Sequence, residues 1–153
     1  MLTPQEDAVL YRLACRLVER FFDGYRGQIR YLPATSQMYS FLAYARNYSP
    51  ERVMDEFVRQ QRLRAEKSGK ASLRAWYGAL EQDFRHGQLA KFVESQLSSA
   101  SESMFRAENG PEQDRDKRKQ LMARYYPIYA RHIVSHYLYR LACFEMGLSG
   151  GEN

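Results

Sequence analysis

The sequence predicts an all-α protein, a compact bundle of five to six helices. Apolar residues recur at three- and four-residue steps along nearly the whole 153-residue chain, which is the spacing of one helix face. No segment alternates apolar and polar residues as a half-buried strand does. The composition, 44% hydrophobic and 27% charged, is typical of a folded globular chain, and the length fits one domain. We therefore expect a single helical domain at residues 1–148, followed by a flexible tail at 149–153.

The first helix is predicted to begin at Thr3, with Thr3 as N-cap and Pro4 at the first helical position. Its apolar stripe consists of Leu10, Leu13, Leu17, Phe21 and Tyr25. The pair Leu32-Pro33 predicts a break, because the residue before a proline is pushed out of the helical region.

A second, short helix is expected after this break, capped by Thr35 or Ser36 and ending near Asn47. Ser49 followed by Pro50 is a typical helix start and predicts the third helix. The buried face of the third helix consists of Val53, Met54, Phe57 and Val58.

The basic residues that begin at Arg59 extend beyond the end of the third helix to a predicted turn, Ser68-Gly69-Lys70. Ser72 can cap the fourth helix, which should end at His86-Gly87. Its apolar stripe is the most regular of the chain and consists of Leu73, Trp76, Tyr77, Leu80 and Phe84.

The last third of the chain predicts a fifth helix from Leu89 to Met104 and a final helix after Asn109-Gly110-Pro111, which we expect to break the chain. The charged residues 112–119 indicate a solvated helix start. Pro127 should kink the final helix or restart it. The hexapeptide Leu10–Cys15 recurs at Leu138–Cys143. The repeat is explained either by coincidence between two core helices or by first and last helices that are equivalent neighbours.

The positive charge of the chain is gathered in one short segment. The net charge is +5, and residues 59–74 contain six cations against one anion, Glu66, so the rest of the chain is neutral overall. Arginine, whose planar fork suits phosphate oxygens, far outnumbers lysine. The segment predicts a surface for a nucleic-acid backbone, although basic runs are also common on solvated helix faces. The candidate residues are Arg59, Arg62, Arg64, Lys67, Lys70 and Arg74, with Arg26 and Arg30 as weaker candidates.

Other patterns argue against catalysis or a metal site. His132 and His136 are four residues apart and share a helix face with Tyr139 and Cys143, and two such histidines could share a zinc ion. However, Ile133 stands where the zinc-protease pattern needs glutamate, and no further ligands are evident, so a solvated or partner-facing stripe is expected. Because no nucleophile motif or acid–base pair is evident either, we expect no enzyme, no cofactor and no bound metal.

The compartment is expected to be the cytoplasm. The N-terminus lacks a signal-peptide pattern, and no stretch approaches the roughly 20 apolar residues that a membrane span needs. Two cysteines are too few for a disulfide scaffold.

The order of features resembles the small helical subunits of type III CRISPR effector complexes. The residues that carry the resemblance are Leu32-Pro33-Ala34-Thr35-Ser36-Gln37 before a short apolar helix, the basic middle segment, the stripe Leu73–Phe84, and a final aromatic-rich helix ending in Gly150-Gly151. The final helix departs from the family by carrying His136-Tyr137 in place of Ala-Tyr-His.

This resemblance implies a structural subunit without catalytic activity. Its partners would be RNA, both guide and target strand, and other subunits of the complex, with self-association as a further option and no membrane. The basic residues would contact phosphates of the guide–target duplex, while base pairing reads the sequence. The alternative is a helical protein-interaction module without nucleic acid, whose interface would contain the exposed tyrosines and the line of His132, His136 and Tyr139.

Overall fold

The computed structural model describes residues 2–24, 31–100 and 106–147, and in these ranges the chain forms helices joined by turns, without a strand. The predicted all-α bundle is therefore confirmed. The elements are α1 (Pro4–Gly24), α2 (Thr35–Asn47), α3 (Pro50–Arg52), the π-helical turn η1 (Val53–Val58), α4 (Arg59–Lys67), α5 (Ala71–His86), α6 (Gln88–Ala100) and α7 (Arg106–Glu145). The predicted tail, 149–153, lies outside the described residues.

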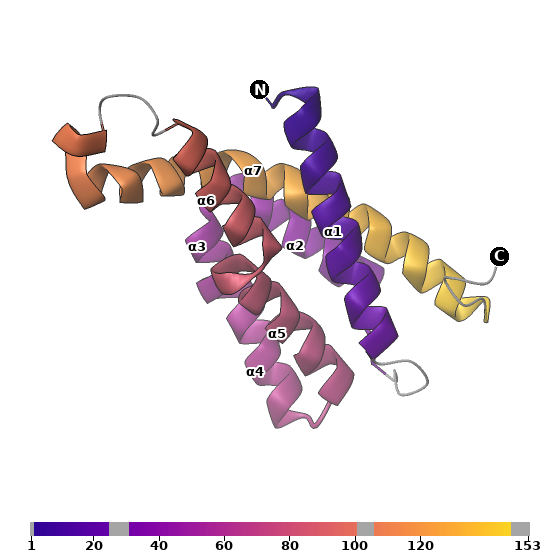
Figure 1. The fold of residues 1–153 in the computed structure, drawn as a ribbon. Helices are drawn as coiled ribbons and strands as arrows, with labels where there is room; N and C mark the ends of the chain where they lie inside the picture. Colours follow the sequence, from indigo (N-terminus) through magenta and orange to yellow (C-terminus); the bar gives the residue numbers. More distant parts are fainter. Residues whose placement is uncertain (1, 25–30, 101–105, 148–153) are drawn as a thin grey trace.

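The long helix α7 runs across the molecule, and α1, α2, α3 and α6 pack against it (Figure 1). The first helix, α1, crosses α7 and has its most extensive contacts with it, and α2 packs beside the same helix. The repeated hexapeptide therefore lies on two neighbouring helices. Helices α4 and α5 lie side by side as a hairpin, and the turn between them is at the far end of the bundle, at the bottom of Figure 1. No helix of the described part is long and apolar enough to cross a membrane.

Two of the predicted helix starts are confirmed. The Thr3 hydroxyl accepts a hydrogen bond from the Glu6 amide at 3.1 Å, and the Glu6 carboxylate accepts one from the Thr3 amide at 2.9 Å. This reciprocal pair fixes the first turn of α1. At the third helix, the Ser49 hydroxyl accepts from the Arg52 amide at 3.3 Å, with Pro50 at the first position.

Two predicted caps are wrong. Ala34 precedes α2 as its N-cap, so Thr35 and Ser36 are already helical, and the Gln37 side chain accepts from the Ala34 amide at 2.9 Å. This bond satisfies the amide of the N-cap residue, as the third-position side chain does in a capping box. Ser72 lies inside α5, whose N-cap is Lys70, because its hydroxyl is engaged by the segment that precedes α2.

The break predicted at Asn109-Gly110-Pro111 is absent, and the final helix does not restart at Pro127. Helix α7 begins at Arg106 and continues through Asn109-Gly110-Pro111 and through Pro127 to Glu145. A proline inside a helix removes one hydrogen bond and costs about 3 kcal/mol. Around Pro127 the buried residues Tyr126, Tyr129 and Ala130 pack into the core, and this burial outweighs the local cost.

An aromatic cluster joins the helices at the centre of the bundle. The Trp76 ring lies 5.1 Å from Phe21 and 4.8 Å from Tyr137, measured between ring centroids. The Tyr137 hydroxyl donates to the Pro33 carbonyl at 2.6 Å, so a buried polar group is satisfied while it fastens the start of α2 to α7. Burial raises the pKa of Tyr137 well above its ordinary value.

Candidate nucleic-acid interface

The hairpin of α4 and α5 carries the basic segment to one end of the molecule. Helix α4 ends at Lys67, and Gly69 closes the turn with φ of 67°, a conformation that glycine adopts without strain. The Lys70 amide donates to the Ala65 carbonyl at 2.9 Å, which satisfies a free carbonyl at the end of α4. The predicted turn is confirmed.

Two of the six predicted cations are held by a nearly buried carboxylate on α5. The Arg59 guanidinium donates to Glu81 at 3.0 Å, and Arg62 forms an ion pair with the other Glu81 oxygen at 2.8 Å. Arg85 lies 3.5 Å from Glu81, and Asp55 lies 3.0 Å from Arg59. We call these five residues the Glu81 cluster.

The Glu81 cluster joins α4 to α5 and leaves little free charge. Burial alone would raise the pKa of Glu81, but the hydrogen bond from Arg59 and the charges of Arg62, Arg59 and Arg85 outweigh it, so the pKa is lowered. The carboxylate is therefore ionised at neutral pH and compensates the arginines around it. Arg59 and Arg62 thus stabilise the hairpin and are poor candidates for phosphate contacts.

The other four cations remain available around the α4–α5 turn. In the part of the chain that the structure describes, no carboxylate lies within ion-pair distance of them. Two of them, Lys70 and Arg74, line a small hollow of about 110 Å³, to which Glu66 adds one negative charge. We call this set the basic corner. It consists of Arg64, Lys67, Lys70 and Arg74.

The start of α5 adds positive potential to the basic corner. No side chain caps this helix, and the first intrahelical bond is the one from the Arg74 amide to the Lys70 carbonyl. The amides of residues 71–73 are therefore free of backbone acceptors. Free amides at a helix N-terminus, together with the helix dipole, favour a bound phosphate.

Tyr31 is an aromatic side chain of the basic corner that sequence reasoning missed. Its backbone is fastened to α5, because the Ser72 hydroxyl donates to the Tyr31 carbonyl at 2.6 Å and accepts from its amide at 3.2 Å. The Lys70 ammonium lies 5.2 Å from the centre of the Tyr31 ring, which is half exposed. An exposed ring beside cations suits stacking on a base.

Trp76 and Tyr77, the aromatic residues of the predicted apolar stripe next to the basic segment, are fully buried, so neither can stack on a base. Arg26 and Arg30 lie outside the described residues. Arg30 is the chain neighbour of Tyr31.

The two histidines of this stripe on α7 pack against α1, so the prediction that they are solvated or face a partner is wrong, whereas Tyr139 on the same stripe is exposed. His132 lies 2.9 Å from the Asp7 carboxylate and edge-on to Tyr11, and His136 lies 3.5 Å from Glu19. Both histidines are engaged because α1 crosses α7 at this point. Among the described residues, no group of three or more histidine, cysteine or acidic side chains could hold a metal ion.

Comparison of the chain with protein-family models, with curated proteins and with solved structures gave no significant match.

Proposed function

We propose that the chain is a non-catalytic subunit that binds the backbone of RNA at the basic corner. The observation that carries the proposal is the contrast between the two halves of the basic segment. Arg59 and Arg62 are paired with Glu81, whereas Arg64 and Lys67 at the end of α4, and Lys70 and Arg74 at the uncapped start of α5, have no carboxylate partner among the described residues. Uncompensated cations beside free amides are suited to phosphate oxygens.

The proposed binding is independent of sequence. Phosphate contacts fix a nucleic acid in place but carry no base information. Tyr31 supplies a stacking surface that accepts any base. This chemistry agrees with the resemblance to the small subunits of type III CRISPR effectors, in which base pairing between guide and target reads the sequence and other subunits cut.

The test is binding of a fluorescein-labelled 20-nucleotide single-stranded RNA, measured by anisotropy. A variant with all four cations of the basic corner changed to glutamine should bind more than tenfold more weakly. The matched control changes four exposed cations elsewhere to glutamine, Arg12, Arg16, Arg46 and Lys91. Both variants lose the same net charge, so equal losses of affinity would refute a localised site. Far-UV circular dichroism checks that both variants stay helical.

A protein-interaction module is the second candidate, because large apolar side chains are exposed at one position of α1, near the end of α7 and just beyond it. Tyr11, Tyr139 and Met146 are 54%, 60% and 71% exposed. Aromatic residues and methionine are enriched in protein interfaces. Gel filtration before and after nuclease treatment separates the two candidates. A 260 nm absorbance that disappears with nuclease supports RNA binding, and a large species that resists nuclease supports the interaction module.

A further inference from the structure

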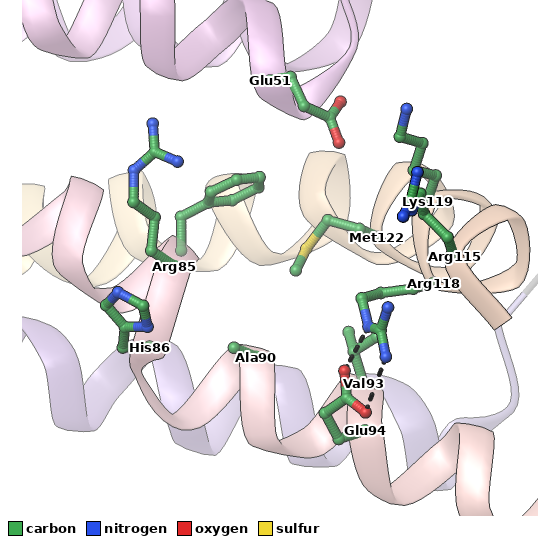
Figure 2. Close-up of a pocket in the computed structure, with 11 residues that line it drawn as sticks. Glu51, Arg85, His86, Ala90, Val93, Glu94, Arg115, Arg118, Lys119 and Met122 are labelled. Carbon is green, nitrogen blue, oxygen red and sulfur yellow. Dashed lines mark hydrogen bonds and ion pairs between the residues drawn. The ribbon is translucent and has the colours of Figure 1, made fainter. Parts of the chain in front are cut away.

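A second candidate site lies at the other end of α5, in a cavity of about 450 Å³ between α6 and α7 (Figure 2). Its floor is apolar and is formed by Phe84, Ala90, Val93 and Met122. The volume is in the range of sites for small organic ligands, which are mostly apolar with a few polar groups at the edge. Since α5 has 16 residues and a helix rises 1.5 Å per residue, this cavity and the basic corner are about 24 Å apart along α5.

The α7 edge of the cavity carries two cations that form no ion pair with any side chain that the structure describes. Arg115 and Lys119 lie one helical turn apart, and like charges at this spacing repel each other. Arg118, which lies between them in the sequence, is engaged by Glu94 (dashed lines in Figure 2). Among the side chains that the structure describes, which leave out residues 99–113 in this region, no carboxylate lies within ion-pair distance of Arg115 or Lys119.

The other edges of the cavity would orient a ligand. Arg85, from the end of α5, is already shared with Glu81 at 3.5 Å and Asp55 at 3.9 Å. Glu51 reaches toward the cavity from α3 and makes that side negative (Figure 2). An acidic group is therefore attracted to the α7 edge and repelled from the α3 edge.

We propose that this cavity binds a small organic anion, with its apolar body on the floor and its acid group between Arg115 and Lys119. The acid group would relieve the repulsion between the two cations and accept charge-assisted hydrogen bonds from both. The ligand class is an organic sulfonate, phosphate or carboxylate with an aromatic or aliphatic body. The site does not depend on RNA binding at the basic corner.

Two related dyes test the proposal on the full chain. 1-Anilinonaphthalene-8-sulfonate has an acid group, and N-phenyl-1-naphthylamine has the same rings without it. The sulfonate should bind with enhanced, blue-shifted fluorescence and at least about tenfold more tightly than the neutral dye. Changing both Arg115 and Lys119 to glutamine should remove this preference. The matched control changes Lys91 and Lys117, exposed cations that do not line the cavity, and should keep it.

Methyl NMR locates the dye. With 13C-methyl methionine, the Met122 signal should shift on titration with the sulfonate, while those of Met38 and Met54, buried elsewhere in the core, should stay in place. Equal affinity for the two dyes, an unchanged preference in the glutamine variant, or an unmoved Met122 signal would overturn the proposal. Competition then identifies the ligand class. Displacement of the dye by AMP indicates a nucleotide-like phosphate as ligand, and displacement by octanoate indicates a fatty acyl carboxylate. If neither compound displaces the dye, the result contradicts the site.

Discussion

Changing Glu81 to glutamine should destabilise the protein, because the side chain is nearly buried and forms ion pairs with three arginines. Removing one partner of a buried ion pair costs about 3–5 kcal/mol. Arg59 and Arg62 are 39% and 36% exposed, so water can solvate the charges left behind, and we expect about 2 kcal/mol. For a chain of this length, each kcal/mol lowers the melting temperature by about 2–4 °C, which gives a loss of about 4–8 °C at neutral pH.

The sign of the pH dependence follows from the lowered pKa of Glu81. The ionised carboxylate contributes stability above its unfolded pKa, about 4.3, and this contribution is lost as the pH falls through the lower folded value. The difference between wild type and Glu81→Gln should therefore be full near pH 7 and shrink as the pH falls below about 4.

Thermal unfolding followed by circular dichroism at 222 nm, repeated from pH 7 to pH 3, measures this difference. The control is Glu56→Gln, which removes an exposed ion pair between Arg52 and Glu56, four residues apart in the sequence. This substitution should lower the free energy of unfolding by less than about 1 kcal/mol. Equal effects of the two substitutions would refute the assignment of Arg59 and Arg62 to a structural role. A difference in melting temperature between wild type and Glu81→Gln that stays constant down to pH 3 would refute it as well.

Three further substitutions test the packing around the core. Tyr137→Phe leaves the buried Pro33 carbonyl without its donor and should cost about 1–3 kcal/mol in urea unfolding; a neutral effect would argue against the bond. Gly87→Ala would place a Cβ 2.6 Å from the Asp83 Cα, so thermal unfolding should show a loss of about 1–3 kcal/mol, and a stable variant would contradict the close approach. Pro127→Ala restores a helix hydrogen bond and should raise the melting temperature, whereas a lower one would show that the proline ring contributes essential packing.

The helices could be predicted from sequence because apolar spacing reports burial directly. The starts at Thr3 and Ser49 were also correct, since each has a short polar side chain followed by proline. The cap at Thr35 failed because α2 starts one residue earlier, where Gln37 accepts from the Ala34 amide, and the cap at Ser72 failed because a distant segment engages its hydroxyl. Ser72 binds the backbone of Tyr31, 41 residues away, and no local pattern reports this.

The candidate site was predictable in part for a similar reason. Charge counting finds the basic segment, but it does not divide the segment into compensated and free cations. That division depends on Glu81, which follows Leu80 on the buried side of α5. A carboxylate next to an apolar stripe is expected to be partly buried and therefore to need a cation nearby. Glu81 was thus the sequence signal that Arg59 or Arg62 forms a structural ion pair. The histidine line was misjudged because its partner, α1, lies more than 100 residues earlier in the chain.

The salt dependence of RNA binding tests the central claim most directly. Four free cations on a single strand predict a slope of log affinity against log salt of about −2.8, or a loss of about 50-fold between 50 and 200 mM salt. The variant that lacks the four cations of the basic corner should show a slope near zero, while Arg62→Gln should keep the wild-type slope. A wild-type slope that persists in the four-cation variant would contradict RNA binding at the basic corner.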